Sequence, residues 1–160
     1  MGDAHAAGMF ALWSDPDVCR YSGPLVDADG RPIRSPVAAV ADSDRIIAFW
    51  TTACREGRGC RWALTLRSSG AFVGSAGFNS LGPCSEYAYH LLPAFWGGGL
   101  MAEATAVLFA WVASAHACRE VEAFVDPANV RSVAFAERQG FARAGVAADG
   151  TIRYVSALSV

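Results

Sequence analysis

Three consecutive glycines, Gly97–Gly99, follow the aromatic pair Phe95–Trp96 and precede an apolar segment with helical periodicity. The first N–H groups of a helix have no intrahelical partner, and the helix dipole places partial positive charge at the same end. Glycines before such an end leave room for an anion, so that backbone amides alone can bind a phosphate. The stretch therefore indicates a phosphate-binding loop, with a tight strand-to-helix turn as the structural alternative.

Two better-known phosphate motifs fit this loop poorly. No Lys-Ser or Lys-Thr pair follows it, so the P-loop pattern of nucleotide triphosphatases is absent. The letters GGGLMA (97–102) satisfy a loose G-x-G-x-x-A dinucleotide fingerprint. That motif belongs after the first strand of a parallel series, whereas we expect three antiparallel strands before this loop. A dinucleotide-binding domain is therefore the weaker alternative.

The elements that position the loop follow from periodicity and turn residues. Two short helices in 3–21 are separated at Asp15–Pro16, a loop covers 22–36, and a helix within 37–57 has Ser43 as its N-cap. A hairpin (61–78) and a third strand (85–92) form an antiparallel meander before the loop. A helix at 100–117, a strand at 121–126, a helix at 129–139 and a strand pair at 141–160 follow. The apolar face of the 100–117 helix is expected to comprise Val107, Leu108, Trp111, Val112 and Ala115.

This order predicts one domain, residues 1–160, with a mixed α/β sheet flanked by helices. The strand, helix and strand around the glycine loop should form a right-handed crossover with the two strands parallel. Ligands of such sheets bind outside the carboxyl ends of the strands, which is where the loop lies.

Two motifs, read together, resemble the GNAT superfamily of acyl-CoA-dependent N-acyltransferases, and within it the RimJ/RimL branch that acetylates N-termini of ribosomal proteins. The branch shows a strand ending in aliphatic-x-Pro, followed by aromatic-Trp-Gly-x-Gly-x-Ala-x-Glu-Ala. It also shows Asn-x-x-Ser followed by Gly-Phe. The matching residues are Leu91, Pro93, Phe95, Trp96, Gly97, Gly99, Glu103, Ala104, Asn129, Ser132, Gly140 and Phe141.

The resemblance implies an α/β (α+β) GNAT-like fold, with a mostly antiparallel sheet and a central β-α-β unit that binds acyl-CoA. It also shows departures. Met101 stands where the family has Gly or Ala, and Ala136 replaces the tyrosine that many members use to protonate the leaving thiolate. The family's first strand has no counterpart, so the sheet edge that it would cover is expected to be exposed or paired in a homodimer.

The activity implied by the resemblance is direct attack of an amine on the thioester of acetyl-CoA, without a metal. Because amines are mostly protonated at neutral pH, a general base is useful, and Glu86 is the candidate, directly or through water. His90 is a second candidate, with a hydrogen-bonded sheet histidine as the alternative interpretation. Ser132 is the candidate proton donor to the thiolate, and the N–H of Leu91 or Leu92 the candidate oxyanion donor.

The same resemblance implies the residues that bind the cofactor. We expect Asn129 to cap its helix or contact the pantetheine arm, and Phe135 to pack near the cofactor or in the core. The aromatic residues Trp13, Tyr21, Trp50 and Trp62 are candidates for the wall of the acceptor site, with core packing as the default. The full set expected to bind the cofactor is Leu91, Leu92, Trp96, Gly97, Gly98, Gly99, Leu100, Met101, Ala102, Asn129 and Phe135.

Composition restricts the partners. The chain is 53% hydrophobic and 18% charged, with a formal net charge of −2, which is typical of a globular protein without the basic surface that nucleic acid or an anionic membrane requires. The longest apolar run, 104–115, is too short to span a bilayer. The five cysteines are scattered, which favours reduced, mostly buried thiols in a cytoplasmic protein over zinc or disulfides.

The sequence thus predicts an acetyl-CoA-dependent N-acetyltransferase whose amine acceptor it does not identify. The alternative is a catalytically degenerate member of the same fold that binds acyl-CoA as a sensor. Ala136, Met101 and the missing first strand motivate that alternative.

Overall fold

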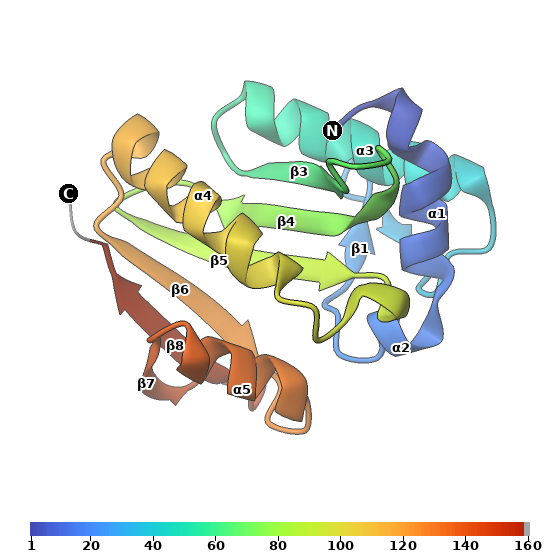
Figure 1. Ribbon diagram of the computed structural model, residues 1–160. Coiled ribbons are helices and arrows are strands. Elements are labelled where there is room, and N and C mark those ends of the chain that lie inside the picture. The colour runs from blue at the N-terminus through green and yellow to red at the C-terminus, as the bar shows by residue number, and fades with distance from the viewer. Residues whose placement is uncertain (159–160) are drawn as a thin grey trace.

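The computed structural model describes residues 1–158 (Figure 1). Three short helices, a small strand pair and a longer helix come first, followed by three strands, a second long helix, and then a strand, a helix and two strands. The elements are η1 (Asp3–His5), α1 (Ala6–Ser14), α2 (Pro16–Cys19), β1 (Leu25–Val26), β2 (Pro32–Ile33), α3 (Val40–Arg55), β3 (Cys60–Thr65), β4 (Phe72–Ser80), β5 (Cys84–Leu91), η2 (Pro93–Phe95), α4 (Leu100–His116), β6 (Glu120–Val125), α5 (Val130–Arg138), β7 (Ala142–Val146) and β8 (Ile152–Ala157).

The main sheet has six strands in the order β3-β4-β5-β6-β8-β7. Neighbouring strands are antiparallel, except for β5 and β6, which are parallel and joined through α4. The predicted meander, crossover and mixed, mostly antiparallel sheet are therefore confirmed.

Helices cover both faces of this sheet (Figure 1). Strand alternation sends adjacent residues of β3 to opposite faces: Trp62 packs edge-on against Trp111 of α4, while the Arg61 guanidinium lies over the ring of Trp50 in α3. Two apolar clusters result. One lies between the sheet and α4 and α5, and the other lies beneath α1 and α3.

The break between the first two helices lies where the sequence predicts it. Asp15 caps α2, because its Oδ1 accepts hydrogen bonds from the N–H groups of Asp17 and Val18 at 2.8 and 3.2 Å. Pro16 occupies the first helical position, where its missing N–H costs nothing.

Two expectations for the long helices are wrong. Helix α3 begins at Val40 with Ala39 as N-cap, and Ser43 is instead fully buried on the face that also carries Ile46. In α4, Val107 is 67% exposed and Ala115 is also exposed. The buried stripe is instead Met101, Thr105, Leu108 and Val112, whose spacing of four, three and four residues keeps one face toward the sheet.

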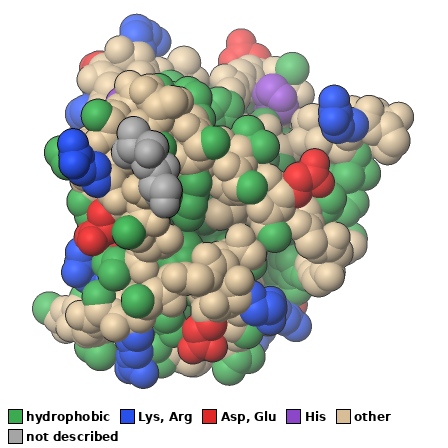
Figure 2. Space-filling model, turned by 60° about the vertical axis from the view of Figure 1, so that its left-hand side comes forward, with side chains coloured by type: hydrophobic (Ala, Val, Ile, Leu, Met, Phe, Trp, Pro, Cys, Tyr) green, Lys and Arg blue, Asp and Glu red, His purple; other side chains and the backbone are tan. Residues whose placement is uncertain are grey.

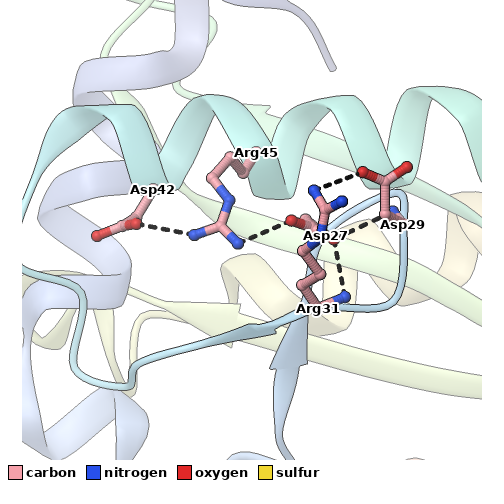
Figure 3. A network of polar contacts seen from close by, with 5 residues as sticks. All are labelled: Asp27, Asp29, Arg31, Asp42 and Arg45. Carbon is pink, nitrogen blue, oxygen red and sulfur yellow. Dashed lines mark hydrogen bonds and ion pairs between the residues drawn. The ribbon is translucent and has the colours of Figure 1, made fainter.

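The segment expected to be only a loop contains the short pair β1–β2, attached to α3 by a polar network (Figure 3). The carboxylate of Asp27 accepts the N–H groups of Asp29 and Arg31 and pairs with Arg45 at 2.7 Å. Arg45 also reaches Asp42 of its own helix. The hydrogen bond from Arg45, with those from the backbone, holds the pKa of Asp27 below its usual value. The turn is thus ordered by tertiary contacts that periodicity does not encode.

The expectation of reduced, mostly buried cysteines is also wrong. Cys54 in the last turn of α3 and Cys60 at the start of β3 form a disulfide, because the chain turns back so tightly that their Cα atoms lie 4.4 Å apart. Among the free thiols Cys118 is buried, Cys19 is half-buried and Cys84 is exposed.

Thiol titration checks this pairing. Unfolding the protein without reductant should release three reactive thiols per chain, and unfolding after reduction should release five. A Cys54→Ser, Cys60→Ser double variant should give three in both conditions. Five thiols before reduction would contradict the disulfide.

On the face of the molecule shown in Figure 2, positively and negatively charged side chains are scattered among apolar and neutral ones.

Within residues 1–158 no strand precedes α1, and β3 is an edge of the sheet. In the same range no helix is long and apolar enough to cross a bilayer, and no group of three or more His, Cys, Asp or Glu side chains is placed to hold a metal ion.

Candidate active site

A cleft opens where β5 and β6 separate. The two strands pair only over Cys84–Glu86 and Glu120–Glu122, although β5 continues to Leu91 and β6 to Val125. Figure 1 shows them side by side at their beginnings and apart further along. A cavity of about 580 Å³ lies at this open end, which is the size of a small-molecule site.

Four parts of the chain line the cleft: the end of β5, the glycine loop with the start of α4, the helix α5 with its N-cap, and α2 with the residues after it. Besides His90, the second candidate base, seven residues predicted to bind the cofactor or act in catalysis line the cleft. They are Leu91, Trp96, Gly97, Met101, Asn129, Ser132 and Phe135.

The backbone of Leu91 points into the gap. Leu92 donates its N–H to the carbonyl of Val73 in β4 at 2.9 Å. Because hydrogen-bonded residues alternate along an antiparallel pair, the N–H and C=O of Leu91 point away from β4, toward the gap. On that side its carbonyl accepts the indole N–H of Trp96 at 2.8 Å. Leu91 is thus the donor available for an oxyanion, and the expectation that Leu92 could serve is wrong.

The glycine loop has a backbone that other residues rarely adopt. Gly97 and Gly99 have φ of +77° and +79°, in the left-handed region, whereas Gly98 does not have a positive φ. Gly99 is the N-cap of α4 and no side chain caps that end, so the first amides of a 17-residue helix are available to a ligand. Gly98, Gly99, Leu100 and Ala102 belong to this turn without lining the cleft.

Met101, the departure from the family pattern, is buried beneath the loop rather than blocking it. Its sulfur accepts a hydrogen bond from the hydroxyl of Tyr87 on β5 at 3.3 Å. Burial raises the pKa of Tyr87, so this tyrosine stays protonated. The larger side chain therefore ties the start of α4 to the sheet.

The opposite wall is the first turn of α5. Asn129 caps it, because its Oδ1 accepts the N–H of Ser132 at 3.2 Å. This confirms the capping role expected for Asn129. The ring of Phe135 meets that of Tyr89 edge-on, with centroids 4.9 Å apart, and the hydroxyl of Tyr89 donates to Ser132 Oγ at 3.1 Å.

Charges of opposite sign lie at different parts of the cleft. Arg131 and Arg138 come from α5, and the guanidinium of Arg131 stacks over Trp96 at 4.5 Å, which connects the two walls. Asp17 comes from α2 and pairs with exposed Arg20. The α5 side is therefore suited to an anion and the Asp17 side to a cation.

His90 lines the cleft but is not placed to act as a base. The hydroxyl of Ser22 donates to the carbonyl of Val18, so it accepts a hydrogen bond from His90 Nε2–H at 3.0 Å. His90 Nδ1 is buried, has no partner among residues 1–158, and its ring packs on Trp13. Burial, assisted by the charge of Arg61, lowers the pKa of His90 to about 3. The hydrogen-bonded sheet histidine is thus the interpretation that the structure favours.

Glu86 lies at the closed end of the separation, at the last position where β5 pairs with β6. Its carboxylate accepts a hydrogen bond from the amide of Asn79, which in turn accepts one from Arg61. It is not one of the residues that line the cleft. A role for Glu86 as base stays a prediction, and it requires water between the carboxylate and the amine.

Comparison with known proteins identifies this arrangement. The sequence profile of the Acetyltransferase (GNAT) domain matches residues 1–142. The chain belongs to the GNAT family. It is therefore an acetyltransferase enzyme of mixed α/β fold, from a family that uses acetyl-CoA as the acetyl donor.

Individual relatives are distant from this GNAT chain. An uncharacterised N-acetyltransferase, p20, of Bacillus licheniformis is 24% identical over 140 residues, which cover 86% of this chain and 73% of the relative. The structure of a ribosomal-protein-S5-alanine acetyltransferase from Vibrio fischeri superposes with a TM-score of 0.77 at 13% identity, covering 98% of this chain and 90% of the other. A spermidine N-acetyltransferase from Vibrio cholerae, in complex with CoA and spermine, gives 0.77 at 10% identity, covering 98% and 92%. Ribosomal-protein and spermidine acetyltransferases both share this fold, so the fold alone does not assign this GNAT chain to the RimJ/RimL branch.

Several residues of this GNAT cleft were missed from the sequence. Tyr89, Arg131, Arg138 and Asp17 line it. Arg131 lies inside the Asn-x-x-Ser motif, so its position was a usable signal, and Asp17 directly follows the predicted helix break at Asp15–Pro16. Of the aromatic candidates for the acceptor wall only Tyr21 lines the cleft, while Trp13, Trp50 and Trp62 pack elsewhere.

Proposed function

We propose that this enzyme transfers the acetyl group of acetyl-CoA to a primary amine by direct attack in a ternary complex. One observation carries the proposal: the open end of the β5–β6 separation brings together an inward-pointing Leu91 N–H, the glycine loop and Ser132. An oxyanion donor, an anion-binding backbone and a hydroxyl are the groups that acyl transfer from a thioester requires.

Binding of acetyl-CoA is proposed along the α5 side of the cleft. The amides of Gly97–Ala102 receive the pyrophosphate, and Arg131 and Arg138 supply positive charge nearby. Asn129 and Phe135 contact the pantetheine arm, and Trp96 holds the carbonyl of Leu91 so that its N–H faces the thioester.

The acceptor is proposed to enter from the α2 side. Asp17 is the only acidic residue that lines the described cleft, and Tyr21 stands near it on the same segment. A carboxylate there attracts an amine in its protonated form, which must lose a proton before it attacks. Both a protein N-terminus, as in the RimJ/RimL branch, and a polyamine fit this chemistry.

Ser132 and Glu86 are proposed as the catalytic residues. Ser132 reaches the cleft from α5 and passes a proton to the departing thiolate. Glu86 accepts the proton of the amine through water, because its carboxylate lies at the closed end of the separation.

An acceptor panel tests the proposal. The purified enzyme is incubated with acetyl-CoA and either a peptide with a free N-terminus, spermidine or a small monoamine, and free CoA thiol is measured. We expect acceptor-dependent thiol release with at least one amine. CoA binding by calorimetry without thiol release from any of them would favour the acyl-CoA sensor instead. Failure to bind CoA would refute both.

The remaining expectations concern partners and location. A homodimer that covers the open edge of β3 stays a prediction, tested by sedimentation at several concentrations. We also propose a cytoplasmic location, with no nucleic-acid or membrane partner. The disulfide weakens one argument for that location, because such bonds are rare in reducing compartments.

A further inference from the structure

A hydrogen bond crosses the cleft between its two walls. Tyr89 lies on β5, and its hydroxyl donates to Ser132 Oγ on α5 at 3.1 Å. Both residues line the cleft, and Ser132 is the only hydroxyl residue on α5. The tyrosine is therefore the direct neighbour of the proposed proton donor.

Both partners of this bond are held in place by other contacts. The Tyr89 ring contacts the rings of Phe135 and Tyr87, with ring centroids 4.9 and 5.7 Å apart respectively. Ser132 sits at the third position of α5, and its N–H is bound by the cap residue Asn129. Two aromatic contacts and a helix cap thus fix the distance between the hydroxyls.

The direction of this bond determines where the serine proton goes. Ser132 Oγ uses a lone pair to accept the proton of Tyr89, so its own O–H is directed elsewhere. The orientation leaves the serine proton available to a group inside the cleft.

Acid strength shows why serine needs a partner. A saturated alcohol is about as weak an acid as water, whereas a thiol has a pKa of about 8.5 and a phenol of about 10. A serine that protonates a thiolate alone would be left as a strongly basic alkoxide. A phenol that replaces the serine proton in the same step removes most of this cost.

We propose that Tyr89 is a positioning residue that orients Ser132 and replaces its proton as the thiolate leaves. The inference rests on the proposed function. As the C–S bond of the tetrahedral intermediate breaks, the sulfur takes the Ser132 Oγ proton and Ser132 Oγ takes the Tyr89 Oη proton. Solvent then returns a proton to Tyr89, while the nitrogen of the new amide loses one to the base.

The surroundings keep Tyr89 ready for this step. Burial raises the pKa of its hydroxyl, so the proton is present at neutral pH, while the bond to Ser132 and the charge of Arg138 act in the opposite direction. The Arg138 guanidinium, which also lines the cleft, is thus available to stabilise the transient phenolate.

A double-mutant cycle on kcat tests the proposal. Tyr89→Phe should lower kcat about a hundredfold, which is typical of losing a proton-transfer group, while KM for acetyl-CoA stays within about twofold. Ser132→Ala should lower kcat at least as far. Because Tyr89 acts through Ser132, the double variant should be no slower than Ser132→Ala alone.

The matched control is Tyr87→Phe. Tyr87 lies on the same strand and face and is more buried. Its change to Phe keeps the ring beside Tyr89 but removes the hydroxyl that is bonded to Thr105 and to the Met101 sulfur, so this variant reports the effect of a structural loss. It should lower thermal stability without lowering kcat as Tyr89→Phe does. Unchanged kcat in Tyr89→Phe, or multiplicative losses in the double variant, would overturn the role of Tyr89 while leaving the proposed function intact. Wild-type protein that binds CoA but acetylates no amine would instead refute the proposed function, and the role of Tyr89 with it.

Discussion

Replacing Gly97 or Gly99 by alanine is expected to weaken CoA binding about five- to thirtyfold, while the protein stays folded. Both residues have a φ near +78° that costs an L-residue roughly 1–2 kcal/mol, and 1.4 kcal/mol corresponds to about tenfold in affinity. A Cβ at either position would meet no atom within 4 Å. The effect therefore comes from the loop shape that presents the amides of α4, and calorimetry with CoA measures it.

Gly98→Ala is the matched control, since it adds the same methyl group to the same loop. Gly98 lacks a positive φ, and its Cβ would lie 3.9 Å from the carbonyl of Phe95, an ordinary contact. CoA affinity should change by less than about twofold. Equal losses at Gly97, Gly98 and Gly99, or none at Gly97 and Gly99, would show that this loop does not bind the pyrophosphate.

Phe78→Ala should cost about 3–5 kcal/mol of unfolding free energy, the range for deleting a fully buried aromatic ring. The Phe78 side chain has no exposed surface and packs among the rings of Tyr87, Phe109 and Trp111, which join β4 and β5 to α4. Because whole domains are stable by only about 5–15 kcal/mol, this change should bring the protein close to unfolding at 37 °C. Denaturant unfolding measures the loss.

Phe124→Ala serves as the control for Phe78→Ala. Phe124 lies on β6 and is 41% exposed, so removing its ring leaves no enclosed cavity. We expect a loss of about 1 kcal/mol or less. Similar losses at the two positions would contradict the packing of the Phe78 ring in the core between the sheet and α4.

The parts of the fold that the sequence predicted are those specified locally. The β3–β4 hairpin follows from alternation around Ser68–Gly70, and the α1–α2 break follows from Asp15 and Pro16. The glycine loop was recognisable because only glycine adopts the φ of Gly97 and Gly99 readily.

The predictions that failed depend on how the elements turn and pack against one another in three dimensions. Ser43 is of a residue type that often caps helices, but α3 begins earlier, at Val40, and buries this serine. Val107 was misplaced because helical periodicity does not determine which side of a helix faces the sheet. The Cys54–Cys60 bond depends on how tightly α3 turns into β3. Leu92 cannot act as the oxyanion donor because its N–H binds the carbonyl of Val73, nineteen positions earlier. The contact of Tyr89 with Ser132 depends on β5 and α5 facing each other, which the sequence alone does not specify.

The separation of β5 from β6 creates a strand edge in the middle of a sheet. The last residues of β5 have no strand beside them on the β6 side, so they make no ladder hydrogen bonds there. The Leu91 N–H, for example, faces the gap. If acetyl-CoA binds in this gap as proposed, it makes some of these hydrogen bonds, and the occupied enzyme should be more resistant to unfolding than the empty one by an amount set by ligand concentration. In the proposed complex the cosubstrate would thus take the place of a neighbouring strand along the end of β5.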